Sequence, residues 1–113
     1  MKRGEVWTVS AGPDYTGKPR PAVILQDDAF AATAAVTLCL FTTHFIDAPL
    51  IRLTVEPSER NGLRASSQLM VDKVTTVSRG TVRSRMGRLS DEDVIRLNRA
   101  VIVFLGLAGS RST

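Results

Sequence analysis

Cysteine and histidine each occur only once in this chain of 113 residues. With Cys39 alone, no disulfide can form within the chain, and a reducing compartment is expected. No apolar segment reaches the ~20 residues that a membrane span needs. Lys2 and Arg3 are not followed by the apolar stretch of a secretory signal. The sequence therefore predicts a soluble cytoplasmic protein with no membrane partner.

Aromatic residues are also scarce, with one Trp, one Tyr and four Phe, so aliphatic side chains must fill the core. Hydrophobic residues make up 43% and charged residues 23% of the chain, which is typical of a globular protein. The length suffices for a single domain, expected over residues 1–108, with a flexible tail at 109–113. One histidine, one cysteine and dispersed carboxylates offer no metal-ligand spacing, so neither a metal nor another cofactor is expected.

Positive charge exceeds negative charge, with a formal net charge of +4 and twelve Arg beside three Lys. Arginine suits bidentate phosphate recognition better than lysine does. One segment, residues 73–90, holds five cations and no acidic residue, and it is expected to attract an RNA backbone or the acidic segment of a partner. An ordinary solvated loop and strand edge is the alternative interpretation. The five cations are Lys73, Arg79, Arg83, Arg85 and Arg88.

Short apolar or alternating segments predict a β-rich body. The segment 36–43 is almost continuously apolar and is predicted to be a central strand. Asn61-Gly62 predicts a tight turn, and residues 27–34 are either a connection or a short helical turn. The predicted strands cover residues 5–10, 21–26, 36–43, 50–55, 67–72, 74–77 and 81–89, the pair 67–72 and 74–77 being read as one strand with a bend.

A helix is predicted to follow Ser90, which is a good N-cap, with Asp93 at the third helical position. Acidic residues fill its first turn, where the helix dipole favours negative charge. An apolar stripe then follows at helical spacing, formed by Val94, Leu97, Val101 and Leu105. The segment 101–107 is apolar on nearly all sides, which indicates either a fully buried helix end or half of a dimer contact.

Several segments, taken in order and spacing, resemble the MazF/PemK family of small bacterial toxins, which cleave RNA. These segments are Arg3 to Trp7, Arg20 to Leu25, Thr42-Thr43, the Asn61-Gly62 turn, Asp72-Lys73, and Gly87 to Ser90 leading into the helix. The resemblance implies a mainly β fold, a small, partly open antiparallel barrel of SH3-like form with a C-terminal α-helix. It also implies a homodimer.

The family's activity can be understood from the chemistry of RNA. The 2′-hydroxyl can attack the adjacent phosphorus without metal or water, given a proton acceptor, a proton donor and cations for the developing charge. The resemblance implies a sequence-specific endoribonuclease, an mRNA interferase, that cleaves single-stranded RNA to 2′,3′-cyclic phosphate and 5′-hydroxyl ends. It further implies a cognate antitoxin whose acidic disordered tail competes with RNA and folds on binding.

Arg20 matches the principal catalytic arginine of the family. A guanidinium stays charged, so charge stabilisation is its simplest role, and pairing with Glu5 across the sheet is the structural alternative. The family also places a hydroxyl residue at the end of the next strand, in contact with the scissile phosphate. Since successive strand residues point to opposite faces, only one of Thr42 and Thr43 faces the site, and the apolar run favours Thr42.

Three further residues are candidates for proton transfer or for orienting Arg20. His44 belongs to the residue type that titrates near neutral pH, and it follows the two threonines, although an exposed loop histidine is the alternative. Glu5 and Asp72 are the acidic candidates, and Asp72 matches an acidic position of the family. Some members carry an arginine two residues before that acid, where this chain has Met70. A mechanism that uses this arginine together with Arg20 would then need another cation in its place. The candidates are Lys73, Arg79, Arg83 and Arg85.

The resemblance implies that the loop 11–19 borders the RNA groove. Tyr15 is a candidate for stacking on a base and Lys18 for contacting a phosphate, with plain surface roles as the alternative. Two other functions remain open at this stage. One is a gyrase-poisoning toxin of the CcdB type, disfavoured because the single Trp is Trp7 and not near the C-terminus. The other is a non-catalytic nucleic-acid-binding barrel, which would not need Arg20.

Overall fold

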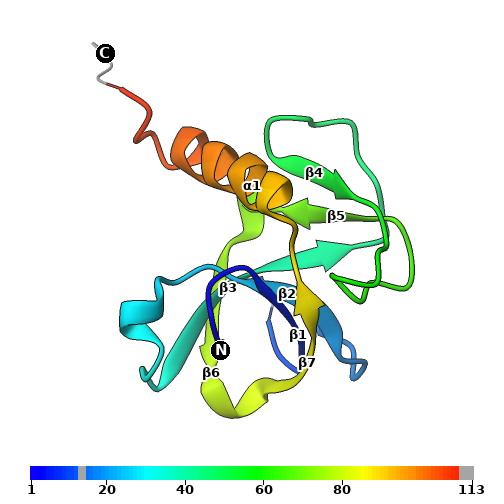
Figure 1. Ribbon diagram of the computed structural model, residues 1–113, viewed down its shortest axis with the longest axis vertical. Helices are drawn as coiled ribbons and strands as arrows, with labels where there is room; N and C mark the ends of the chain where they lie inside the picture. The colour runs from blue at the N-terminus through cyan, green and yellow to red at the C-terminus, as the bar shows by residue number, and fades with distance from the viewer. Residues whose placement is uncertain (13–14, 110–113) are drawn as a thin grey trace.

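The computed structural model describes residues 1–12 and 15–109 and shows a curled antiparallel sheet crossed by one helix (Figure 1). The strands are β1 (Glu5–Val9), β2 (Arg20–Ile24), β3 (Ala35–Thr42), β4 (Arg52–Val55), β5 (Ser67–Met70), β6 (Thr75–Ser78) and β7 (Val82–Arg88). Three short 3-10 turns, η1 (Asp28–Phe30), η2 (Val71–Lys73) and η3 (Arg79–Thr81), and the helix α1 (Asp91–Phe104) complete the chain. The predicted mainly β, partly open architecture with a C-terminal helix is confirmed.

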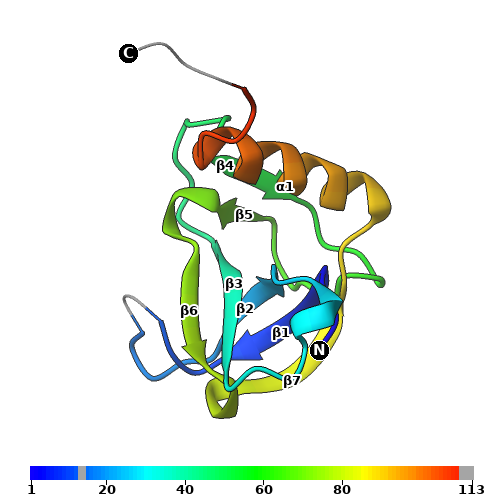
Figure 2. The ribbon, with the colours of Figure 1, turned by 90° about the vertical axis from the view of Figure 1, so that its left-hand side faces the viewer.

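Strand β3 organises the sheet, whose order is β4-β5-β3-β2-β1-β7, with β6 also paired to β3. One edge of β3 pairs with β2. The other edge is divided, because residues 35–38 pair with β6 and residues 41–42 pair with β5. Figure 2 shows β6 and β2 on the two sides of β3. The prediction that 36–43 is central is therefore confirmed.

The bend in the segment 67–77 separates it into two strands. The turn η2 carries the chain from β5 to β6. Val71 is fully buried, and its N–H donates to the Ile51 carbonyl at 2.9 Å. Asp72 is bound to Arg52 of β4. These contacts with a strand about twenty residues earlier in the chain fix where the bend occurs.

The core has two layers because the two faces of β2 and β3 both bury apolar side chains. One layer lies under α1 and includes Val23, Cys39 and Phe41 with Leu97 of the helix. The other layer lies on the opposite face and includes Ala22, Ile24, Leu38 and Leu40. Burial raises the pKa of the Cys39 thiol to about 12, so this cysteine behaves as a small apolar core residue.

Helix α1 begins as predicted, with the Ser90 hydroxyl accepting from the Asp93 N–H at 3.1 Å. Its other end is open, since Leu105 is 56% and Leu107 is 70% exposed. The alternative of a fully buried helix end is therefore wrong. No helix of the described chain has the length and apolar character required to cross a membrane. Of the predicted tail, residues 110–113 lie outside the described residues.

Candidate active site

Arg20 and Thr42 come together where β2 and β3 end. Ala22 pairs with Leu40, and continuing this register by two residues places Arg20 opposite Thr42. Both residues therefore extend the core face formed by Ala22 and Leu40, at the point where that face meets solvent. Arg20 is half-buried, so part of this residue remains reachable from solvent.

Two adjoining hollows meet at this pair. The loop-side pocket has a volume of about 350 Å³ and is lined by Lys18 and Thr43 in addition to the shared residues. The β4-side pocket has a volume of about 250 Å³ and is lined by Arg52 and Lys73 in addition to them. The residues shared by both pockets are Arg20, Thr42 and His44. Three of the predicted site residues are thus brought together.

No carboxylate among the described residues forms an ion pair with Arg20. Glu5, the expected alternative partner, is bound to Arg85 at 2.9 Å and lines neither pocket. A half-buried guanidinium without an internal anion is suited to bind one from outside. The arrangement favours an anionic ligand between Arg20 and Thr42.

Glu5 instead organises the junction of β1 and β7. Burial alone would raise the pKa of its carboxyl, but hydrogen bonds from the Lys2 backbone N–H, the Trp7 indole N–H and the Arg85 guanidinium lower it overall. A carboxylate held ionised by three donors is a weak proton acceptor. The structure does not bring Glu5 to the site.

Thr42 and Thr43 differ in what they face. The Thr42 hydroxyl accepts from the His44 backbone N–H at 3.1 Å and lines both pockets with Arg20. Thr43 is exposed, lines the loop-side pocket and also faces a third hollow. Of the two threonines, Thr42 is therefore the one that lines both pockets together with Arg20.

Gln68 fixes the loop that carries His44, a role not predicted from the sequence. It lies opposite Thr42 in β5 and is buried. Its amide donates to the Ile46 carbonyl and accepts from the Ile46 N–H, each at 3.1 Å. A long polar residue inside a short, otherwise buried strand was the available signal, because a buried amide needs hydrogen-bond partners.

Arg52 was also missed by the sequence reasoning. Its Nε lies 2.8 Å and its Nη2 lies 3.2 Å from the two carboxylate oxygens of Asp72, a bidentate pair in which the Arg52 side chain is only 7% exposed. This hydrogen-bonded guanidinium lowers the pKa of Asp72, which makes Asp72 a poor proton acceptor. The signal was a charged residue between the apolar Ile51 and Leu53.

The other predicted cations divide into two groups. Lys18 and Lys73 line the pockets, one each. Arg79 donates to the carbonyls of Ala31 and Thr33, and Arg83 donates to the Ser10 hydroxyl at 3.4 Å. Neither pocket is lined by Arg79, Arg83 or Arg85. The structure therefore leaves these three outside the Arg20 site.

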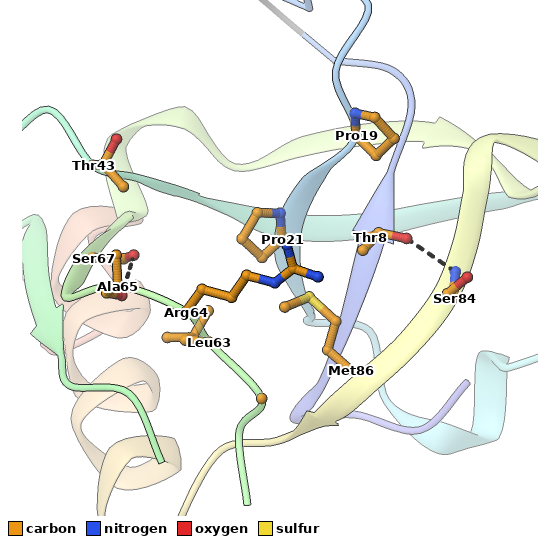
Figure 3. A pocket seen from close by; sticks show the side chains of 11 residues that line it. Thr8, Pro19, Pro21, Thr43, Leu63, Arg64, Ala65, Ser67, Ser84 and Met86 are labelled. Atoms are coloured by element: carbon orange, nitrogen blue, oxygen red, sulfur yellow. Dashed lines mark hydrogen bonds between the residues drawn. The ribbon is translucent and has the colours of Figure 1, made fainter. Parts of the chain in front are cut away.

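A third and larger hollow of about 660 Å³ adjoins the loop-side pocket, with which it shares Pro19, Pro21, Thr43 and Ser67 (Figure 3). Its walls combine apolar side chains with hydroxyls, and Arg64 extends across it toward Met86. The turn at Asn61-Gly62 forms one rim. Gly62 has a φ of +72°, and a Cβ there would overlap the Met86 carbonyl oxygen, so the turn requires glycine.

Tyr15 lies on the loop that leads to the loop-side pocket. Its side chain is 39% exposed, and its N–H donates to the Gly12 carbonyl at 3.3 Å. Tyr15 does not line the pocket itself, whereas Thr16 does. Residues 13–14 of the same loop lie outside the described residues. Among the residues that are described, His, Cys, Asp and Glu form no group of three that could hold a metal ion.

Comparison with known proteins agrees with this architecture. The protein named "Probable endoribonuclease MazF" from Mycolicibacterium smegmatis is 53% identical over 109 residues, covering 96% of this chain and 100% of the relative. "Endoribonuclease MazF" from Staphylococcus saprophyticus is 26% identical, covering 99% and 97% of the two chains. The expected enzyme class matches the names of both relatives.

Solved structures support the fold. A mycobacterial structure described as "Endoribonuclease in complex with its cognate antitoxin" matches with a TM-score of 0.79 at 21% identity, over 97% of this chain and 99% of that chain. Mycobacterium tuberculosis toxin MazF-mt6 matches with a TM-score of 0.78 at 20% identity, over 93% and 99%. Residues 2–105 match the family described as PemK-like, MazF-like toxin of type II toxin–antitoxin system. The chain belongs to this PemK-like, MazF-like toxin family, as its sequence motifs predicted.

Proposed function

We propose that this protein is a metal-independent endoribonuclease that cuts single-stranded RNA at a short sequence motif. The observation that supports this most strongly is the half-buried Arg20 guanidinium, which lies opposite Thr42 with no carboxylate partner among the described residues. An RNA phosphate placed there would accept from both side chains.

The proposed reaction uses a nucleophile that the RNA itself supplies. The 2′-oxygen attacks the neighbouring phosphorus and loses its proton, while the bond from phosphorus to the 5′-oxygen breaks and that oxygen gains a proton. The products are a 2′,3′-cyclic phosphate and a 5′-hydroxyl. Arg20 stabilises the negative charge that builds on the phosphate oxygens, and the Thr42 hydroxyl donates a further hydrogen bond.

His44 is the side chain best placed to move a proton, since it lines both pockets beside Arg20 and Thr42. Asp72 and Glu5 are less suitable because donors hold both as carboxylates. Substitution of His44 by Gln is expected to lower the cleavage rate by about 10- to 100-fold.

The proposed assembly is a homodimer in the cytoplasm, neutralised by an antitoxin with an acidic disordered tail. The exposed apolar end of α1 supports a contact between copies, with Val103 and Phe104 each 44% exposed. The cations of the two pockets favour an acidic segment as competitor for RNA.

The test is cleavage of a long defined RNA in EDTA by the wild type and by Arg20→Ala, with mapping of the cut sites and of the end groups. Discrete cuts with 5′-hydroxyl ends from the wild type, reduced about 1,000-fold or more in the variant, are expected. Equal cutting by both proteins would contradict the role of Arg20. A folded wild type that binds RNA without cutting it would favour the non-catalytic binding barrel.

A further inference from the structure

We propose that Arg52 is a second phosphate-binding cation of the Arg20 site, held in position by Asp72. This inference rests on the proposed ribonuclease function, because the phosphate is that of the RNA. It supplies the second cation that the sequence lacks at Met70. Arg52 pairs directly with Met70 across β4 and β5, and both residues line the β4-side pocket together with Arg20.

The β4-side pocket has a strongly one-sided charge. Among the residues that the structure describes, three cationic side chains line it, namely Arg20, Arg52 and Lys73, and no acidic side chain does. Thr42 and His44 complete its polar lining. A hollow of about 250 Å³ with this lining is suited to one phosphate group.

The ion pair with Asp72 fixes Arg52 without using all of its donors. Asp72 binds Nε and Nη2, whereas a guanidinium carries five N–H groups in a planar fork. Nη1 makes no hydrogen bond within the part of the chain that the structure describes, so it can donate to another acceptor. Since the Arg52 side chain is only 7% exposed, the fork is already ordered before a ligand arrives. An ordered donor loses little entropy when it binds the phosphate.

A purely structural ion pair would behave differently. Neutral replacement of both partners of a buried pair is often tolerated by a fold, whereas removal of one partner leaves an uncompensated charge. If Arg52 and Asp72 only support the bend at η2, their joint neutralisation would leave RNA cleavage and binding unchanged. If Arg52 binds phosphate, the same change removes one cationic contact to RNA.

The experiment compares Asp72→Asn with the double variant Arg52→Gln/Asp72→Asn, so that the two proteins differ only at Arg52. The matched control is Arg96→Gln/Asp93→Asn, which neutralises an Arg–Asp pair of α1 at 2.7 Å outside both pockets. Cleavage rate is measured on a defined RNA. Affinity is measured against salt on the same RNA carrying 2′-deoxy residues, which cannot be cut.

The double variant is expected to cut about 100-fold more slowly than Asp72→Asn. Its plot of log affinity against log salt is expected to be shallower by about 0.7, the value for one lost phosphate contact on a single strand. The control should match the wild type in both measurements. Equal rates and equal salt slopes for the two Asp72→Asn proteins would overturn the proposal.

Thermal unfolding shows whether the double variant is folded. If it is not, the variant Arg52→Lys tests whether Arg52 binds the phosphate. Lysine keeps the charge and can still bind Asp72, but it lacks the fork, so an unchanged salt slope with an about 10-fold lower rate is expected. A wild-type rate for this variant would overturn the proposal.

A wild type that binds but does not cut RNA would refute the ribonuclease function alone, and the salt slopes would still decide whether Arg52 binds phosphate. A wild type that does not bind RNA would overturn both.

Discussion

The arginines of the segment 73–90 and Arg20 differ in what the folded protein places beside them. In the segment 73–90, Arg79 is bound to the carbonyls of Ala31 and Thr33, and Arg85 is bound to Glu5. At the ends of β2 and β3, Arg20 has no such carboxylate partner among the described residues. Arg79 and Arg85 of this segment thus bind groups of the protein itself, whereas Arg20 lines both pockets.

The difference teaches that local charge density does not identify the arginine available to a ligand. A guanidinium can satisfy its N–H groups with backbone carbonyls or a carboxylate of its own protein as well as with a phosphate. Availability depends on what the folded chain places beside it. For Arg20 the neighbours across the strands are Val9 and, by the continued register, Thr42, neither of which is acidic.

The largest expected effect comes from giving Arg20 an internal partner. Thr42→Glu places a carboxylate opposite Arg20, and the pair that forms should occupy the guanidinium as Glu5 occupies that of Arg85. Thr42→Gln is the control of similar size without charge. We expect Thr42→Glu to cut RNA about 1,000-fold more slowly than the wild type and to lose RNA binding, with Thr42→Gln retaining binding. Equal binding by the two variants would mean that Arg20 does not contact the phosphate.

A smaller effect, on stability instead of activity, is expected from Arg79→Ala. The substitution leaves the carbonyls of Ala31 and Thr33 without the guanidinium and should lower the free energy of unfolding by about 2 kcal/mol. Urea unfolding measures this change. RNA cleavage at a temperature where the variant is folded should stay within about threefold of the wild type. A large loss of cleavage by the folded variant would place Arg79 in the site after all.

The Arg52–Asp72 pair predicts that the stability of the fold depends on pH, an effect of intermediate to small size. The pKa of Asp72 in the fold is below its usual 3.8, so the fold holds this carboxylate more tightly than the unfolded chain does. The stabilisation is fully present above about pH 5, shrinks as the pH falls through 3.8, and is lost below the folded pKa. As the pH falls from 5 toward 3, the wild type should therefore lose more stability than Asp72→Asn does. Identical acid unfolding of the two proteins would argue against the pair.

The smallest effect is expected from Arg83→Gln. Arg83 is exposed and has a single long hydrogen bond, to Ser10 at 3.4 Å, so its loss should change stability by less than about 0.5 kcal/mol. RNA affinity at ~0.15 M salt should change by less than about twofold, because an exposed charge away from the site is screened. A tenfold loss of affinity would show that the RNA path extends onto β7.

Local sequence patterns were sufficient to predict the strands and the helix but not the contacts between them. The apolar run of β3 and the Ser90 cap of α1 are encoded within a few residues, and both were predicted. The position of η2 depends on Val71 bonding to Ile51 and on Asp72 binding Arg52, contacts between residues about twenty positions apart. Periodicity contains no information about such pairings, since they depend on which strands become neighbours.

The same limit applies to the site. Arg20 and Thr42 were predicted from a family resemblance in motif order, and His44 from its residue type and its place after the threonines. The fold then brought the three together. Gln68 and Arg52 were missed because their roles exist only through Ile46 and Asp72, which lie on other segments. The carbonyl partners of Arg79 could not be predicted, because they lie more than forty residues earlier in the chain.

The most direct test of the account measures RNA cleavage by Arg20→Ala and Arg79→Ala in parallel, at equal folded concentration, on one defined RNA in EDTA. The account predicts a loss of about 1,000-fold or more for Arg20→Ala and a change within about threefold for Arg79→Ala. Comparable losses in both variants, or a larger loss in Arg79→Ala, would contradict the claim that Arg20 is the arginine that meets the RNA phosphate.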